Sequence, residues 1–437
     1  MQTAYSMPPF ATLLGPEGLS NNKLRLCDRA FHDWYRFVLS FPPHLVKHYI
    51  EQFSLSANTV LLDPFSGTGT TLVEAKKNKI ASIGIEAVPM SHFASSTKVR
   101  WEIGQTALHL AKEQILSEVW QQVDRQQTLG FNLEQTAIIL KNSISERPLH
   151  KCLVLRDAIT AFSQGPVRDL FNLALAYVAV HDASNLKFGP EVGLRRAKQE
   201  DAPVFECWQK KVDQMARDLV QYATLADIPA RCQKGDARGL RSLLEPHSID
   251  AIITSPPYPN EKDYTRTTRL ESVLLGFLHN KADLRAFKQS LIRSNTRNVY
   301  KVDDDDRCLV AQSQINRIAQ EIEDRRIALN KTSGFERLYH RVTTLYFGGM
   351  KRHFETLRPA LKPGARLAYV VGDQASFFQI MIRTGQLLAE IASEVGYEVK
   401  SIDLFRTRLA TATGAQLREE VVVLEWPATA KHTQHFV

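Results

Sequence analysis

The stretch IDAIITSPPY (residues 249–258) joins an apolar run to an abrupt stop. Residues 249–253 are mostly apolar and rich in β-branched side chains, which predicts a buried strand. A polar residue, two prolines and an aromatic ring then end this strand. Consecutive prolines fix φ and remove two backbone N–H donors. The carbonyl oxygens are therefore held rigidly at the carboxyl end of a strand, where open α/β sheets bind ligands.

A planar ring that carries an amino group suits this rim. Its amino hydrogens would donate to the Ser255 side chain and the Pro256 carbonyl oxygen, and the Tyr258 ring would stack on its face. Pro257 keeps the turn stiff. Taken alone, the stretch also fits an ordinary tight turn after a strand.

A second stretch, VLLDPFSGTGTTLVEA (residues 60–75), predicts a strand, a glycine-rich turn and the start of a helix. Gly67 and Gly69 would let a ligand approach the backbone, and the free N–H groups of the helix N-terminus would face it. The Gly-Lys-Ser/Thr ending of a phosphate loop is missing, so no lysine reaches a triphosphate. This order is typical of a nucleotide cradle, and the alternative for each glycine is a plain turn.

Two further strand ends carry acids. Residues 81–86 predict a strand that ends in Glu86, where a doubly wound sheet places a carboxylate against ribose hydroxyls. Another candidate strand runs to Gly235, and Asp236 after it could bind a purine amino group. The alternatives are a solvated loop acid for Glu86 and a helix cap for Asp236.

Composition limits the class of protein. With 437 residues the chain can form one large domain or two to three ordinary ones. A formal charge of +8 favours a polyanionic partner. The five cysteines show no metal-ligand or disulfide spacing, so no metal is predicted. The longest apolar run, Leu170 to Val180, is too short to span a bilayer, and we expect a cytoplasmic protein.

The two motifs together resemble the S-adenosylmethionine-dependent amino-methyltransferases of DNA, which modify N4 of cytosine or N6 of adenine. The resemblance rests on DPFSGTGTT (residues 63–71), Glu86 and TSPPY (residues 254–258). It covers about half of the chain: Phe41 to Met90, Lys234 to Thr265 and Leu361 to Trp426.

The resemblance implies S-adenosylmethionine as cofactor and double-stranded DNA as partner, with the target base flipped out of the duplex. It is also compatible with a cognate restriction system as a partner. The first motif would hold the methionine end of the cofactor with help from Phe41 to Val46, and Ser255, Pro256, Pro257 and Tyr258 would hold the base. The residues predicted to bind the cofactor are Asp63, Pro64, Phe65, Ser66, Gly67, Gly69, Thr70, Thr71, Glu86 and Asp236.

The C-terminal part supports an α/β fold. Residues 361–371 predict a helix end, a Pro-Gly turn and a buried strand. Residues 396–405 and 420–426 predict two more strands across the polar turn at 411–414, and strands this close pair only as an antiparallel hairpin. We therefore predict a Rossmann-like methyltransferase sheet, mostly parallel, with a C-terminal antiparallel hairpin and a large helical insertion.

Four blocks are predicted. Residues 1–90 form an N-terminal arm and the cofactor half of the core. Residues 91–229 form the helical insertion, a candidate target-recognition region whose apolar stripes indicate a core. Residues 230–265 and 345–437 form the catalytic half, and residues 266–344 form a second insertion that is a candidate for DNA contact.

Basic residues in both insertions are candidates for binding the phosphate backbone. These are Arg195, Arg196, Lys198, Arg293, Arg297 and Lys301. The acidic run Asp303 to Asp306 is expected to be a solvated loop. Which insertion reads the target stays open.

The function expected from all of this is methyl transfer to an exocyclic amine of DNA. Ser255, which stands where an Asp would favour adenine, leans toward cytosine N4. The alternatives are adenine N6 methylation, an RNA amino-methyltransferase, and a non-catalytic DNA-binding protein of the same fold. A small-molecule methyltransferase would leave the double proline and the charge unexplained.

Overall fold

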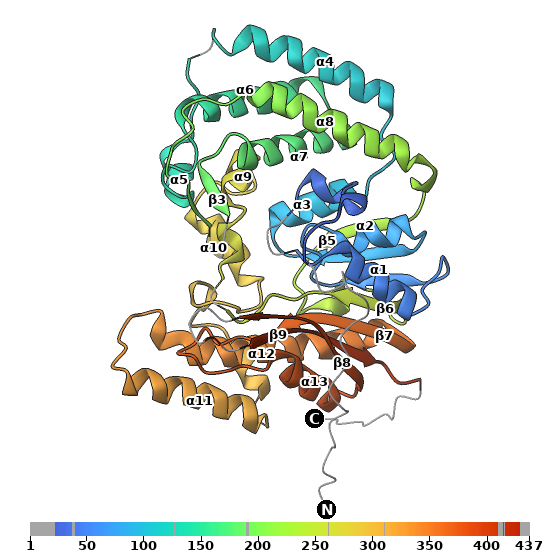
Figure 1. The fold of residues 1–437 in the computed structure, drawn as a ribbon, viewed down its shortest axis with the longest axis vertical. Helices are drawn as coiled ribbons and strands as arrows, with labels where there is room; N and C mark the ends of the chain where they lie inside the picture. Colours follow the sequence, from blue (N-terminus) through green and yellow to red (C-terminus); the bar gives the residue numbers. More distant parts are fainter. Residues whose placement is uncertain are drawn as a thin grey trace, which may run out of the picture.

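A computed structural model describes residues 22–36, 40–125, 127–188, 192–260, 262–309, 311–409, 414 and 416–428 (Figure 1). The predicted N-terminal arm up to residue 21 and residues 411–413 of the predicted C-terminal turn lie outside the described residues.

A seven-stranded sheet with the order β5-β2-β1-β6-β7-β9-β8 forms the centre of the molecule. The first five strands in this order are parallel to one another, whereas β9 runs antiparallel to both β7 and β8. The predicted fold class, a mostly parallel sheet with a C-terminal antiparallel hairpin, is therefore confirmed. The strands are β1 Val60–Asp63, β2 Ala81–Glu86, β5 Ala230–Lys234, β6 Ile249–Thr254, β7 Leu361–Gly372, β8 Glu398–Leu409 and β9 Gln416–Glu425.

Strand β6 lies between β1 and β7, and its apolar run is explained by this central place. Ile249, Ile252 and Ile253 are completely buried, as expected for a parallel strand covered on both faces. The prediction for β7 needs one correction, because the Pro-Gly pair lies inside this strand. Gly364 has φ of +80°, and the register against β6 shifts there, so the pair forms a bulge where a turn was predicted.

Helices cover both faces of the sheet. One face packs against α1 (Pro43–Gln52) and α2 (Thr70–Lys77). The other packs against α12 (Tyr339–Leu357) and α13 (Thr384–Glu394). The three layers leave the carboxyl ends of the parallel strands open at one edge.

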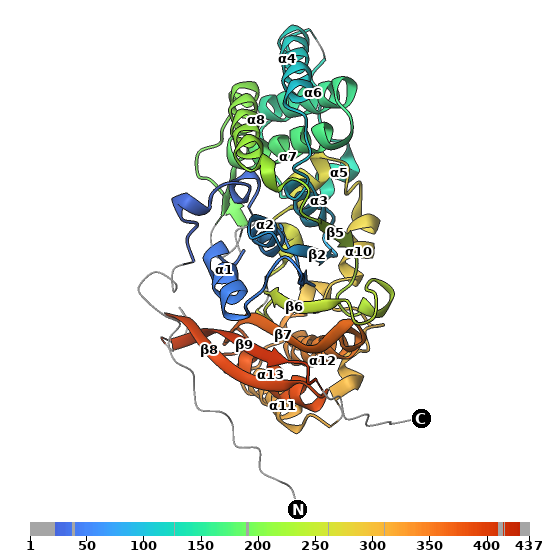
Figure 2. The same cartoon turned by 90° about the vertical axis from the view of Figure 1, so that its right-hand side faces the viewer.

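The helical insertion between β2 and β5 lies at one end of the long axis in both views (Figures 1 and 2). Its predicted stripes, which include Ile115, Trp208 and Met215, are buried in a core that extends to Leu72 and Val73 of α2. Phe31 and Trp34, from the block predicted to belong to the cofactor half, pack in this same core. The insertion contains α3 Pro89–Lys98, α4 Gln105–Gln122, α5 Leu133–Ile138, α6 Glu146–Phe162, α7 Gly165–His181, the unpredicted hairpin β3 Leu186–Phe188 with β4 Val192–Leu194, and α8 Val204–Gln221.

The second insertion, between β6 and α12, connects the two ends of the molecule. Helix α9 (Arg269–Leu274) contacts the helical insertion through Leu274, and α10 spans Lys281–Gln289. Helix α11 (Ser313–Ala328) packs on α12 at the far end (Figure 1). No helix among the described residues is long and apolar enough to cross a membrane. Short 3-10 helices lie at η1 Leu26–Asp28, η2 His32–Trp34, η3 Ala223–Leu225, η4 Leu240–Ser242, η5 Tyr264–Arg266, η6 Thr296–Asn298, η7 Asp305–Leu309, η8 Glu336–Leu338 and η9 Arg358–Ala360.

Candidate active site

A cavity of about 340 Å³ opens at the carboxyl ends of the parallel strands. Both sequence motifs contribute to its wall, as the strand-end rule predicts. Asp63, Gly69 and Thr71 do not line it and lie behind the wall. The predicted residues that do line it are Pro64, Phe65, Ser66, Gly67, Thr70, Glu86, Asp236, Ser255, Pro256, Pro257 and Tyr258.

The loop of residues 66–69, here called the glycine loop, packs closely against helix α3. Gly69 has φ of +83°, and a Cβ atom built on it would lie 2.8 Å from the Ser95 hydroxyl oxygen. The Ser66 and Ser95 hydroxyls are hydrogen bonded at 3.0 Å. The glycine here is therefore required by the helix behind the loop as well as by its left-handed conformation.

Glu86 is held in the wall by two backbone groups. Its Oε2 accepts the N–H of Gly67 at 2.7 Å, and its Oε1 accepts the N–H of Val88 at 2.7 Å. Burial raises the pKa of Glu86 to about 7, and the two N–H donors act in the opposite direction. Each oxygen keeps a further lone pair for a ligand hydroxyl.

Beneath the cavity the two motifs are tied together. The fully buried Asp63 accepts a hydrogen bond at 2.6 Å from the hydroxyl of Thr254, the residue before the Ser-Pro-Pro-Tyr turn. Thr71 donates to the carbonyl oxygen of Ile253 at 3.0 Å. Burial raises the pKa of Asp63 to about 6. Both side chains therefore fix the relative position of the two loops.

The Ser-Pro-Pro-Tyr turn rests on strand β7. Ser255 donates its hydroxyl hydrogen to the carbonyl oxygen of Val370 at 3.1 Å, which leaves its oxygen as an acceptor. The Tyr258 ring lies against Gly372, where a Cβ atom would come within 3.0 Å of the ring. Ser255, Pro256, Pro257 and Tyr258 all line the cavity, and their roles as acceptor rim and aromatic plate stay predictions.

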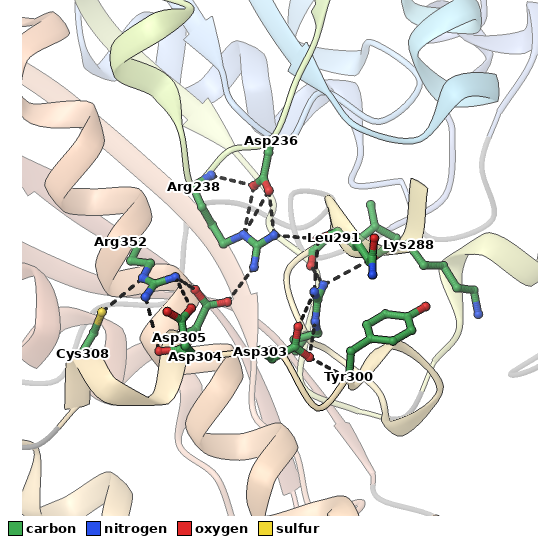
Figure 3. Close-up of polar contacts among 12 residues, drawn as sticks. Asp236, Arg238, Lys288, Leu291, Tyr300, Asp303, Asp304, Asp305, Cys308 and Arg352 are labelled. Carbon is green, nitrogen blue, oxygen red and sulfur yellow. Dashed lines mark hydrogen bonds and ion pairs between the residues drawn. The ribbon is translucent and has the colours of Figure 1, made fainter. Parts of the chain in front are cut away.

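Asp236 belongs to a charged network that the sequence did not reveal (Figure 3). Arg238 binds the Asp236 carboxylate with two nitrogens, Nε at 3.1 Å from Oδ1 and Nη2 at 2.7 Å from Oδ2. Its Nη1 lies 2.6 Å from Asp305 Oδ2, and Nη2 donates to the Gln289 carbonyl at 2.9 Å. Arg352 binds the other Asp305 oxygen at 2.7 Å. Asp236 accepts the Arg238 N–H, but it caps no regular helix.

The prediction of a solvated acidic run at Asp303 to Asp306 is wrong. The backbone of this run lies on helix α12, and Asp305 is 1% exposed. A Cβ atom on Gly348 of that helix would lie 1.9 Å from the Asp305 carbonyl oxygen, so only glycine permits the contact. The buried side chains of Asp303 and Asp305 are paired with Arg293 and Arg352, as expected because burial of a lone charge is costly. The half-exposed Asp304 also pairs with Arg352.

The prediction that Arg293 contacts a phosphate backbone is also wrong. Its side chain is buried, with 2% exposure, and pairs with Asp303 at 2.7 Å. Arg297 and Lys301 are exposed, and the Arg297 guanidinium lies 5.3 Å from the centre of the Phe335 ring.

The basic residues of the first insertion are exposed between β4 and α8. Arg195 turns its guanidinium back to the carbonyl oxygens of Leu186 and His181, at 3.2 and 3.1 Å. Arg196 and Lys198 are exposed beside it. None of the three lines the cavity, so their contact with DNA stays a prediction.

Sequence reasoning missed a large part of the cavity wall. Residues Ser290, Leu291, Ile292, Ser294 and Asn298 of the second insertion line it, as do Arg406 and Arg408 of β8. None of these follows a parallel strand, so the strand-end rule does not find them. The available signal is the polar stretch 293–301, which contains three of the residues predicted to bind the phosphate backbone.

A sheet of this topology, with a glycine cradle and an acceptor rim in one cavity, defines the class of α/β methyltransferases. Comparison with known proteins agrees. Residues 17–91 match the family N6_N4_Mtase, described as DNA methylase. The type II methyltransferase M.BsoBI of Geobacillus stearothermophilus is 25% identical over 448 residues, which cover 92% of this chain and 86% of the relative.

Two further relatives and one solved structure are similar. The type II methyltransferases M.AvaI of Nostoc sp. and of Anabaena variabilis are each 24% identical over 399 residues, covering 84% of this chain and 79% of theirs. The solved structure of TrmN from Thermus thermophilus is 12% identical, with coverage of 91% of this chain and 52% of its own and a TM-score of 0.28. These matches confirm the resemblance to amino-methylating DNA methyltransferases that the sequence predicts.

Proposed function

We propose that the protein transfers a methyl group from S-adenosylmethionine to the exocyclic amine of a flipped base in DNA, most directly N4 of cytosine. The observation that carries this is a single cavity with the glycine loop and Glu86 on one side and Ser255 to Tyr258 on the other. Donor and acceptor bound there are brought into reacting distance by position alone.

The residues on the donor side fit S-adenosylmethionine. The left-handed backbone of Gly67, which lines the cavity without a side chain, leaves room for close approach of a ligand. Glu86 offers fixed carboxylate oxygens to the ribose hydroxyls, and Asp236, held by Arg238, offers an acceptor to the adenine amino group. The bound cofactor supplies an electrophilic sulfonium methyl group.

On the acceptor side, the protein makes the amine more nucleophilic. Its lone pair is delocalised into the ring, so a more tetrahedral nitrogen must be favoured. The Ser255 oxygen and the Pro256 carbonyl accept the amine hydrogens and concentrate electron density on nitrogen. Stacking on Tyr258 offsets part of the cost of extruding the base, which is a few kcal/mol.

Preference for cytosine rests on Ser255, a neutral hydroxyl at the first position of the motif. Sequencing of host DNA at base resolution after expression tests the proposal, with a Tyr258→Ala variant as the control. N4-methylcytosine in one short context supports it. N6-methyladenine would overturn the choice of base, and unmodified DNA would overturn the activity.

The names of the relatives support a role beside a type II restriction enzyme. The test is whether DNA from the expressing host resists a cognate endonuclease. The RNA alternative is tested by offering transfer RNA and duplex DNA to the same preparation, and methylation of the RNA alone would favour it. Failure to bind S-adenosylmethionine would favour a non-catalytic DNA-binding protein.

A further inference from the structure

Residues 293–303, here called the 293–303 loop, form part of the cavity wall. The loop follows helix α10 and contains the short helix η6. Ser294 and Asn298 line the cavity. The loop thus brings polar side chains of the second insertion into the place where the two motifs meet.

An ion pair between two residues of the loop stabilises its conformation. Arg293 binds both oxygens of Asp303, Nη2 to Oδ1 at 2.7 Å and Nε to Oδ2 at 2.8 Å. The Tyr300 N–H donates to Asp303 Oδ2 at 2.6 Å (Figure 3). Both charged side chains are at most 5% exposed. A bidentate, buried pair across ten residues fixes the conformation of the loop before any ligand arrives.

The loop also contacts the segment that follows the acceptor motif. Asn295 Nδ2 donates to the Lys262 carbonyl at 3.1 Å. The Lys262 N–H donates to Asn260 Oδ1 at 3.3 Å, and both of these residues line the cavity. Asn260 and Lys262 follow Tyr258 by two and four residues. The 293–303 loop therefore lies next to the side of the cavity formed by the Ser-Pro-Pro-Tyr turn.

Asn298 is the unusual member of the loop. It is 2% exposed, and its Oδ1 is buried with no hydrogen-bond partner among the described residues. A buried carbonyl oxygen without a donor is destabilising because it has lost its hydrogen bonds to water and gained none in return. Because Asn298 belongs to the cavity wall, this unpaired oxygen is a candidate acceptor for a donor group of a ligand bound in the cavity.

We propose that Asn298 reads the ring edge of the target base, an inference that rests on the proposed methyl transfer. Cytosine and adenine both present an amine hydrogen next to a ring nitrogen that accepts. The carboxamide has the complementary pair, so Oδ1 accepts this hydrogen, shared with the Ser255 oxygen, and Nδ2 donates to the ring nitrogen. Asn298 therefore selects amine-bearing bases and aligns the amine.

The test combines a protein change with a substrate change. Wild type and Asn298→Ala are compared on duplexes that contain the target site, with either the normal base or the analogue whose ring nitrogen is replaced by C–H (3-deazacytosine or 1-deazaadenine). We expect the single-turnover rate of wild type to fall roughly ten- to hundredfold on the analogue. Asn298→Ala should show a similar fall on the normal base and little further loss on the analogue.

Such non-additivity identifies the contact, because a structural defect would add to the substrate effect. If the rate losses caused by the variant and by the analogue multiply when the two are combined, the proposal is overturned. A raised dissociation constant for S-adenosylhomocysteine in Asn298→Ala also overturns it, because it would place the side chain on the donor side. Asn298→Asp keeps the acceptor but removes the donor, so its rate on the normal base should fall as that of wild type does on the analogue, with little further loss on the analogue.

Asn330→Gly is the matched control. It removes an exposed carboxamide of the same insertion at a residue with φ of +50°, and wild-type rates are expected. If wild type methylates no DNA, the proposed function fails. If wild type is active and Asn298→Ala equals it on both duplexes, only the assignment of Asn298 fails.

Discussion

In the proposed function Tyr258 supplies the aromatic face that the target base stacks on, so its ring and the stiff turn before it should matter for methyl transfer and not for cofactor binding. We expect Tyr258→Ala and Pro257→Ala to abolish methyl transfer and to leave S-adenosylhomocysteine binding unchanged. Tyr258→Phe should retain activity because stacking does not need the hydroxyl. A tritiated-methyl assay and calorimetry measure the two properties, and full activity of either alanine variant would contradict the site.

Glu86 is expected to account for a large share of donor affinity. Glu86→Ala removes an acceptor that two N–H groups hold in place, and it should weaken S-adenosylhomocysteine binding by about 1–3 kcal/mol. Isothermal titration calorimetry gives the difference directly. An unchanged dissociation constant would remove Glu86 from the site.

The raised pKa of Glu86 predicts a pH dependence of the same affinity. The ionised carboxylate accepts hydroxyl hydrogens, and it is lost as the pH falls through about 7. Affinity should therefore be full at pH 8.5 and decrease toward pH 5.5. In Glu86→Gln, which has no such proton to gain, the decrease should be absent; a wild-type affinity that stays constant would refute this assignment.

At the level of elements, helix α12 offers a matched pair of glycines. Gly348→Ala places a methyl group 1.9 Å from the Asp305 carbonyl oxygen, whereas Gly349→Ala meets its nearest atom at 3.5 Å. Overpacking should destabilise the first variant by roughly 1–3 kcal/mol. The second should be neutral or gain up to about 1 kcal/mol of helix propensity. Urea unfolding measures both, and equal midpoints would disprove the contact.

Some elements could be predicted from the sequence because their burial is local and repetitive. Strands β1 and β6 are apolar runs with abrupt ends, and their ends carry the two motifs. The β3–β4 hairpin was missed because each strand has three residues and little alternation. The acidic run was assigned to solvent because its arginine partners, Arg238 and Arg352, lie far from it in sequence.

For the molecule as a whole, the charge of +8 predicts salt-sensitive DNA binding. Lysines and arginines that neutralise phosphates release counterions, so the logarithm of affinity should fall linearly with the logarithm of salt concentration. Fluorescence anisotropy with a labelled duplex between about 50 and 200 mM salt measures the slope. Affinity that does not change over this range would mean that phosphate contacts contribute little.

Like the fold, the candidate site has a part that the sequence predicts and a part that it does not. Glu86, Asp236 and the Ser-Pro-Pro-Tyr turn were found because the ends of parallel strands converge in space. Asn298 and Arg238 were not found, because their place in the site depends on contacts between distant segments of the chain. Only the folded structure brings these segments together. Arg293 was misjudged for the same reason, because a basic residue in a polar stretch gives no sign of an internal partner.

The pairing of β1 with β6 has a consequence for biosynthesis. The N–H of Val60 at the start of β1 bonds the Asp250 carboxylate of β6, across 190 residues of chain. At ribosomal rates this separation corresponds to roughly ten to forty seconds of translation. During that interval the nascent chain has β1 and β2 but an unpaired, apolar strand edge. The cavity is thus completed late in synthesis. Until then the exposed strand edge can aggregate, so fast elongation or binding by chaperones should protect the nascent chain.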